Sequence, residues 1–308
     1  MAIACFLLWN GALGGATFSE SFSSGSFNPL RWDSGTAGGA GVLNVANQRA
    51  EFVVTSAGGE SSAFRVWRGP LPVDTDWEAV LTVNNSHAPT QGGQNSSIGL
   101  SLKHPTDPDE QVYVELYASG NDGGSDRGFL SALERSTTIF GEADAVVPGS
   151  TLAYVRISYN AAARVVTTSY DRDGPGLAHG WTTHATFGLG GSGGATGNQN
   201  WNLSNASKFT LRIGAFSEFT TVTPGSVWGD DLVLTIPGYV PPTLGIATSG
   251  ANVRLRWPGK ENVFRIESST GLSPASWSLV IPTPQAVGED LMVTLPAPAT
   301  PTFYRLAY

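Results

Sequence analysis

The chain has 308 residues, of which 41% are hydrophobic and 14% charged, whereas about 25% charged residues is usual for a soluble domain. Its 38 glycines and 19 prolines disfavour a helical bundle, because both residues destabilise helices. Nine Trp, eight Tyr and 14 Phe supply enough apolar surface for a core and argue against disorder. The formal net charge of −8 argues against a nucleic-acid-binding protein that contacts phosphates.

The first 16 residues, MAIACFLLWNGALGGA, form an apolar segment that ends in small residues. Gly14 and Ala16 occupy the positions that a signal peptidase prefers, so residues 1–16 predict a signal peptide and a secreted or cell-surface protein. The segment lacks a basic start. It is therefore a degenerate signal peptide, part of a signal that starts further upstream, or, as the alternative, a buried first strand. Cleavage would remove the single cysteine, Cys5. No other stretch reaches the ~18 apolar residues of a membrane span.

After residue 16, apolar residues alternate with period two, and no helical period is sustained. Many short alternating segments separated by turn residues favour a β-sandwich. The predicted strands are 48–55, 62–67, 77–83, 97–103, 111–117, 152–159, 165–170, 209–216 and 231–236. The glycine-rich segment 188–198 predicts a surface loop, since it lacks the Lys-Ser/Thr ending of a phosphate-binding loop.

Proline and glycine at 236–242 predict a domain boundary, because both residues interrupt strand pairing. We therefore expect one domain at 17–237 and a smaller one at 243–308. The smaller part has five basic and four acidic residues, a net charge of +1, which leaves −9 for the rest of the chain. Its alternating segments predict a second, smaller β-sandwich; they are 253–257, 264–268, 291–295 and 303–308.

The larger predicted domain resembles concanavalin A-like (laminin G-like) jelly-roll domains. The opening segment FSESFSSGSFNPLRW at 18–32 carries this resemblance. So do the hairpin at 154–170 with its following Asp-Arg-Asp-Gly, and the closing segments RIGAFS at 212–217 and GDDLVL at 229–234. The resemblance implies an all-β fold, a jelly-roll sandwich, and is not specific for an activity.

The smaller part resembles the fibronectin type III-like modules that close many secreted bacterial proteins. The resemblance rests on the segments VRLRW, FRIESSTGL, SW and TFYRL, in that order, at 253–257, 264–272, 276–277 and 302–306. It implies a small β-sandwich that acts as a spacer or adhesive appendage and gives the protein a surface for a protein partner.

Strand geometry predicts a ligand-binding face on the larger domain, since alternate side chains point to opposite sides. Turning Val112, Val114 and Leu116 inward leaves their alternate neighbours on the open side, and the same rule sends Phe64 and Val66 inward. Rings stack on the C–H faces of sugars while Arg and Glu bind hydroxyls. The predicted ligand-binding residues are Arg65, Trp67, Tyr113, Glu115, Tyr117 and Arg212. The alternatives are a second core beneath loops and a position on the convex sheet.

These observations predict non-catalytic recognition of an extracellular polysaccharide. A second hypothesis is a glycoside hydrolase or polysaccharide lyase that uses Glu115, Tyr113, Tyr117 and Arg65 on the same face. Against it, the paired-acid strand motif Glu-x-Asp-x-x-Glu of retaining glycosidases is absent. The two acids at 142 and 144 have a suitable spacing, but their surroundings predict a solvated loop. A third hypothesis is a surface or matrix protein that binds another protein.

Calcium is the expected ion, and this expectation comes from the jelly-roll resemblance. In many such domains an acid on the first strand and one on the last converge on a structural ion. The resemblance implies Glu20, Asp230 and Asp231 as ligands here, with backbone carbonyls and waters completing the six to eight oxygens that calcium takes. The alternative is that the Asp pair only forms a turn. The histidines lack the spacing of a zinc site.

Overall fold

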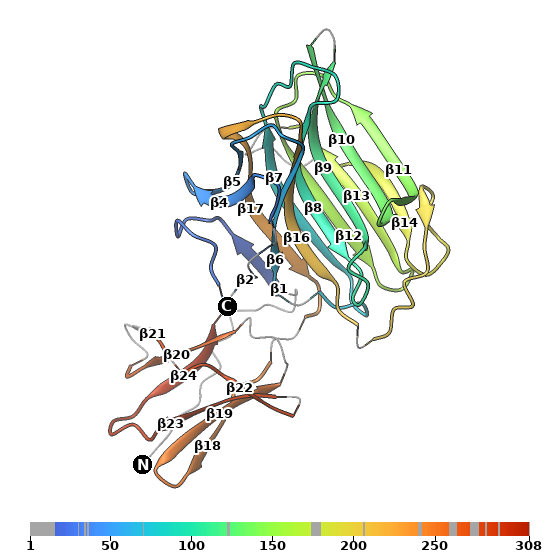
Figure 1. The fold of residues 1–308 in the computed structure, drawn as a ribbon. Coiled ribbons are helices and arrows are strands. Elements are labelled where there is room, and N and C mark those ends of the chain that lie inside the picture. The colour runs from blue at the N-terminus through green and yellow to red at the C-terminus, as the bar shows by residue number, and fades with distance from the viewer. Residues whose placement is uncertain are drawn as a thin grey trace. The chain divides into compact units, whose positions relative to one another are not determined.

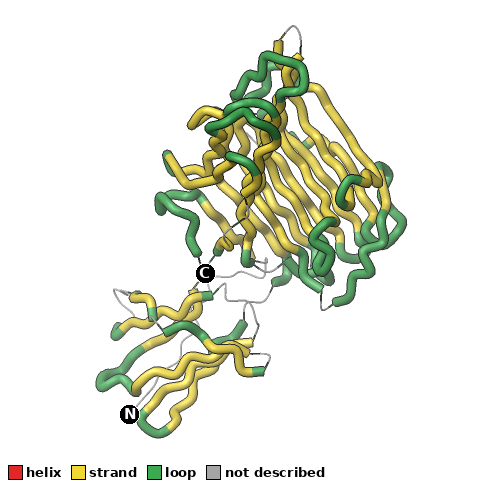
Figure 2. Tube along the Cα trace, in the orientation of Figure 1, coloured by secondary structure: helices red, strands yellow, loops and turns green. Residues whose placement is uncertain are grey.

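A computed structural model describes most of the chain and shows strands and loops, with no helix among the described residues (Figure 2). The all-β prediction is therefore confirmed. No helix in the described part is long and apolar enough to cross a membrane. The predicted signal peptide, except Ala16, lies outside the described residues, which are 16–29, 31–33, 35, 37–69, 71–121, 124–173, 180–205, 207–239, 242–258, 264–271, 277–280, 282–288 and 290–307.

The chain divides into two compact units, and Thr17–Pro237 is the larger one. It is a jelly-roll sandwich of two sheets (Figure 1). Sheet A has nine strands in the order β15 (Gly197–Asn198), β14 (Thr182–Gly188), β13 (Val165–Asp171), β12 (Leu152–Asn160), β7 (Trp77–Asn85), β17 (Val222–Ile236), β5 (Arg49–Val54) and β4 (Gly41–Ala46), with β1 (Ala16–Glu20) also paired to β17.

Sheet B has eight strands, and its neighbouring strands are all antiparallel. Their order is β11 (Thr138–Val146), β10 (Gly124–Arg135), β9 (Glu110–Asn121), β8 (Asn95–Lys103), β16 (Thr210–Glu218), β6 (Glu60–Trp67) and β2 (Trp32–Asp33), with β3 (Ala37–Gly38) also paired to β6. The late strand β16 inserts between β6 and β8, so residues distant in sequence share one face.

The core lies between the two sheets and follows from the alternation of apolar residues. On β9, Val112, Val114 and Leu116 have no exposed surface. They face sheet A, where Leu81 and Val155 are equally buried. Full burial of each such side chain contributes about 1.5–3 kcal/mol. The same alternation turns the intervening residues of β9 to the outer face of sheet B.

The two sheets also approach each other at Gly141 on β11 and Gly197 on β15. A Cβ added to Gly141 would lie 2.7 Å from the Cα of Gly197, and one added to Gly197 would lie 2.8 Å from the Cα of Gly141. Only glycine permits backbones to approach so closely. The end of the predicted loop at 188–198 therefore packs against sheet B.

The smaller unit includes Gly238–Tyr308 and has two antiparallel sheets of its own. Its core contains Val253, Leu255, Trp257, Ile266 and Val293. The fibronectin type III-like character of this unit stays a prediction. One sheet has the order β18 (Gly245–Ser249), β19 (Asn252–Pro258), β23 (Asp290–Pro296) and β22 (Gln285–Val287), and the other β21 (Ser278–Leu279), β20 (Arg265–Ser269) and β24 (Phe303–Ala307).

Candidate functional site

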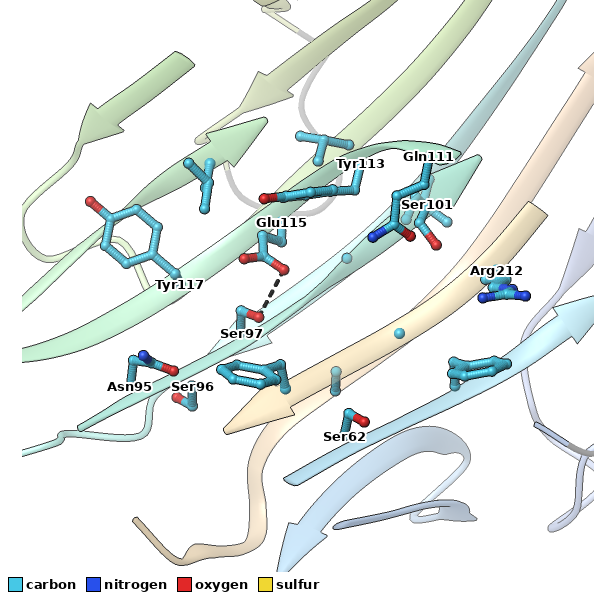
Figure 3. Close-up of a pocket in the computed structure, with 18 of the residues that line it drawn as sticks. Ser62, Asn95, Ser96, Ser97, Ser101, Gln111, Tyr113, Glu115, Tyr117 and Arg212 are labelled. Atoms are coloured by element: carbon cyan, nitrogen blue, oxygen red, sulfur yellow. Dashed lines mark hydrogen bonds between the residues drawn. The ribbon is translucent and has the colours of Figure 1, made fainter. Parts of the chain in front are cut away.

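The outer face of sheet B contains a groove of about 970 Å³ (Figure 3). Six neighbouring strands contribute to it, namely β6, β16, β8, β9, β10 and β11. Because strands in a sheet lie about 4.8 Å apart, these six span roughly 24 Å. The groove is therefore long enough for an extended ligand.

Glycines form part of the floor. The strand register aligns Gly214 on β16, Gly99 on β8 and Glu115 on β9 in one row. A Cβ at Gly99 would lie 2.0 Å from the Val114 carbonyl oxygen, so this position accepts no side chain. A Cβ at Gly214 would meet only the Cβ of Phe64, at 3.8 Å. The groove is hollow above Gly214 because the chain places no side chain there.

Aromatic rings flank this floor on both sides. Tyr113 and Tyr117 lie on either side of Glu115 along β9 (Figure 3). Phe64 of β6 lines the groove on the opposite side. The Arg212 guanidinium lies 4.3 Å from the centre of the Phe64 ring, a cation–π contact that fixes the position of the charge. Flat apolar surfaces thus alternate with hydrogen-bonding groups.

Glu115 carries the most perturbed carboxyl group of the groove. Its pKa is raised to about 7, because burial and the Glu134 carboxylate raise it more than the hydrogen bond from Ser97 lowers it. The Ser97 hydroxyl donates this bond to Oε2 of Glu115 over 2.8 Å (Figure 3). Glu115 can therefore hold or release a proton near neutral pH.

The two tyrosines are held in their neutral form. Burial raises the pKa of Tyr117, and its hydrogen bond to Asp144 raises it further. The phenol donates this bond to Oδ1 of Asp144 over 2.9 Å. Burial also raises the pKa of Tyr113, with the Glu115 carboxylate as the next cause. Both phenols remain hydrogen-bond donors at physiological pH.

The structure brings together four of the six predicted ligand-binding residues, namely Tyr113, Glu115, Tyr117 and Arg212. Their predicted position on the open face is correct. Ser62, Asn95, Ser97, Ser101 and Gln111 add hydroxyl and amide groups to the same groove.

The predicted position of Arg65 and Trp67 on the open face is wrong. Trp67 is only 3% exposed, and its ring packs edge-on against Trp32 with 5.1 Å between centroids. Arg65 donates to the Leu43 carbonyl oxygen over 3.0 Å. Each face of β6 carries an aromatic residue, so alternation alone could not tell which face is turned inward. Phe64 faces the groove instead.

Sequence reasoning also missed the acidic side of the groove. Glu142 and Asp144 lie on β11 and not in a solvated loop, and Glu134 lies on the neighbouring strand β10. The signal was weak because the residues alternating with these two acids are Gly141, Ala143 and Ala145, which are small. An alternation of acidic with small residues was the pattern that could have revealed this strand.

The structure places the predicted calcium ligands Glu20, Asp230 and Asp231 in other contacts, and calcium binding stays a prediction. Glu20 accepts hydrogen bonds from the Phe22 amide (3.1 Å) and the Trp32 indole (3.4 Å), and the Arg31 guanidinium lies 3.5 Å from its Oε2. The Asp231 amide donates to its neighbour Asp230 over 2.8 Å, at a register shift within β17 where Asp231 has φ 47°. No group of three or more His, Cys, Asp or Glu among the described residues is arranged to hold a metal.

No family model matches the chain, and no curated protein matches its sequence. Among solved structures it is similar to winged bean acidic lectin in complex with methyl-α-D-galactose (10% identity, TM-score 0.41, 72% of this chain and 98% of the lectin). It is also similar to the CBM2 module of the evolved Dit of Lactobacillus casei BL23 phage J-1 (13% identity, TM-score 0.44, 73% of this chain and 97% of the module). A third similar structure is the endo-1,3-β-glucanase of Streptomyces sioyaensis (13% identity, TM-score 0.42, 75% of this chain and 98% of the glucanase).

Proposed function

We propose that the larger unit binds an extracellular polysaccharide in the groove of sheet B. The observation that carries this proposal is the alternation of aromatic rings with hydroxyl, amide, carboxyl and guanidinium groups along one open groove. A pyranose ring has apolar C–H faces and a rim of hydroxyls, so its recognition needs both kinds of group. The span of six strands suits several sugar units.

Each side chain then has a role that follows from its chemistry. Tyr113 and Tyr117 provide rings for stacking, and their phenols donate hydrogen bonds. Glu115 accepts hydrogen bonds from sugar hydroxyls, with Ser97 holding its carboxyl group in position. Arg212, fixed on the Phe64 ring, donates hydrogen bonds to sugar oxygens.

Hydrolysis of the bound glycan is the second candidate, and one observation favours it. A carboxyl group whose pKa is raised to about 7, as for Glu115, can donate a proton to a departing sugar oxygen near neutral pH. Hydrolysis needs a second carboxylate across the scissile bond, and Glu134 lies in the same groove. The lyase hypothesis loses Arg65, which lies outside the groove.

Blocking the groove tests the proposal. Gly214→Leu is expected to fill the space above the floor without disturbing the fold, since a Cβ there has only an ordinary contact with Phe64. Affinity electrophoresis in gels with neutral, amino-sugar and uronate polysaccharides should show retention of the native protein by at least one of them. Gly214→Leu should lose it. A reducing-end assay on the same polymers detects hydrolysis.

The matched control is Gly190→Leu. Gly190 is exposed outside the groove, where an added Cβ meets only the Arg164 side chain at 3.5 and 3.6 Å. This variant should be retained like the native protein. Retention by no polysaccharide, or equal retention of native protein and Gly214→Leu, would exclude glycan binding in the groove. Release of reducing ends that Glu115→Gln abolishes would establish the hydrolase.

A further inference from the structure

The groove carries a strong excess of negative charge. Among the described residues that line it, Arg212 is the one cationic side chain. Six lining residues are acidic, namely Glu60, Glu115, Asp126, Glu134, Glu142 and Asp144. Carboxylates this close together repel one another, and a bound cation relieves that repulsion.

The acids concentrate on one half of the groove. Strand register places Glu115, Leu130 and Asp144 in one row across β9, β10 and β11. The next row ends in Glu142, which is paired with Ala132 of β10. Carboxyl groups thus line one side of the groove on three neighbouring strands.

Hydrogen bonds from neutral groups hold these carboxyl groups. Glu134 accepts from the Gln111 amide over 2.5 Å, as Asp144 does from a phenol and Glu115 from a hydroxyl. A neutral donor positions a carboxylate but leaves its charge uncompensated. The raised pKa of Glu115 is one sign of this, since the Glu134 carboxylate contributes to it.

Cations lie near the groove on β16 and β8, and Lys103 of β8 shares a row with Gln111 and Glu134. Arg212 lies on the Phe64 ring at the β16 side. Lys103, on the strand beside it, donates to the Pro108 carbonyl oxygen over 2.8 Å. Burial and next Arg212 lower its pKa to about 8, although the Glu134 carboxylate acts in the opposite direction. The groove therefore has an acidic half on β9–β11 and a basic margin on β16.

We infer that the groove selects polysaccharides of amino sugars with free, protonated amino groups over neutral and uronate polysaccharides. This inference rests on the proposed glycan binding and names its substrate class. An ammonium group donates up to three hydrogen bonds and is attracted by the carboxylates of β9–β11. The hydroxyls of a neutral sugar form hydrogen bonds with these carboxylates but have no charge to be attracted, and the carboxylates of a uronate are repelled by them.

The test compares two hexamers with the same backbone, glucosamine and N-acetylglucosamine, by isothermal titration at about pH 6, where amino groups are protonated. The glucosamine hexamer should bind about tenfold more tightly, and added salt should reduce this ratio. The double variant Glu142→Gln with Asp144→Asn should weaken glucosamine binding by about tenfold and N-acetylglucosamine binding by much less.

A second double variant controls for the net charge of the protein. Asp74→Asn with Asp173→Asn removes two exposed acids outside the groove. It should bind both hexamers like the native protein. Equal weakening by the two double variants would show unspecific attraction, and an N-acetylglucosamine hexamer or oligogalacturonate that binds as tightly would show no selection for amines. Either result overturns the inference.

The two proposals fail in distinguishable ways. Binding of a neutral or uronate polymer that Gly214→Leu abolishes, without preference for free amines, would leave glycan binding intact and overturn only the amino-sugar selection. Absence of binding to every polymer of the panel would overturn glycan binding itself and the selection with it.

Discussion

Two buried carboxyl groups of the larger unit have opposite surroundings. Glu51 on β5 is 2% exposed and accepts hydrogen bonds from Asn47 (2.9 Å), Arg49 (2.8 Å) and the Gly225 amide (3.0 Å). Burial by itself would raise its pKa, but these bonds and the Arg49 charge together lower it. Glu115 in the groove has a neutral hydroxyl and another carboxylate as neighbours, and its pKa rises.

The difference separates a carboxylate that supports the fold from one that is ready for a ligand. The fold itself supplies the cation and the donors for Glu51. Around Glu115 the fold supplies burial, one hydroxyl and like charge, so compensation has to come from a proton or from a bound molecule. Carboxyl groups perturbed in this way concentrate at functional sites.

Removing the partner of Glu51 is expected to cause the largest loss of stability. Arg49→Met keeps an apolar side chain beside Trp228, whose ring centre lies 4.5 Å from the guanidinium carbon, but leaves the Glu51 carboxylate without a cation. We expect a loss of about 2–3 kcal/mol in the free energy of unfolding, measured with urea at about pH 7. Arg172→Met, at an exposed position, should change it by less than about 0.5 kcal/mol. Similar losses for both would contradict the structural role of Glu51.

Glu115→Gln is expected to stabilise the protein at high pH. Because the folded pKa of about 7 exceeds the ordinary value of 4.5, native Glu115 lowers the free energy of unfolding progressively between these two values. Gln removes this loss, so the variant should gain about 3 kcal/mol at pH ~8 and nothing below pH ~4.5. Urea titrations across this range measure it. Parallel pH profiles of variant and native protein would contradict the raised pKa.

The pH profile of Glu51 should have the opposite sign. Its folded pKa lies below the ordinary value, so its stabilisation is complete above the ordinary value and disappears as pH falls through the folded one. Comparing Glu51→Gln with Glu115→Gln should therefore show the first variant losing stability mainly at neutral pH and the second gaining it there. Profiles of the same sign would remove the distinction between the two sites.

Ser97→Ala is expected to cost about 1 kcal/mol, because it removes the hydroxyl that donates to Glu115. The bond stabilises mainly the charged carboxylate, so the cost should be greater at pH ~8 than at pH ~5, and the pKa of Glu115 should rise further. Urea denaturation at the two pH values measures it. Equal costs at both would show that Ser97 contributes by packing alone.

Tyr117→Phe is expected to have the smallest effect on stability, below about 0.5 kcal/mol, since it removes one hydrogen bond at an exposed margin of the groove. On the glycan it should lower affinity less than about threefold, because the ring that stacks remains. Tyr117→Ala should lower affinity more than tenfold, about the loss of a good stacking contact. Equal losses for both variants would assign the contribution to the phenol hydroxyl.

Alternation predicted the orientation of β9 correctly and that of β6 incorrectly, for a physical reason. On β9, Val112, Val114 and Leu116 are uniformly apolar and their neighbours polar or amphipathic, so one orientation is clearly favoured. On β6, Phe64 competes with Trp67, and the choice depends on Trp32, which reaches Trp67 from another strand. The alternation of residues within one strand does not show which distant strand pairs with it.

The acidic half of the groove shows the same limit. The position of Glu142 in the groove depends on the register of β11 with β10 and of β10 with β9. The hollow floor depends on Gly99 and Gly214, which the insertion of β16 beside β8 brings together. The sequence predicted the jelly-roll class and four residues of the groove. Long-range register created the charge pattern and the shape.

The glycine contact between β11 and β15 has a consequence for how the protein behaves at high concentration. These strands stand at the margins of sheets B and A, where unpaired peptide groups could recruit a strand from another molecule and start aggregation. Gly141 and Gly197 let the two margins cover each other at this point. Any larger residue at either position would force them apart and open a template for intermolecular pairing, so these two glycines protect solubility.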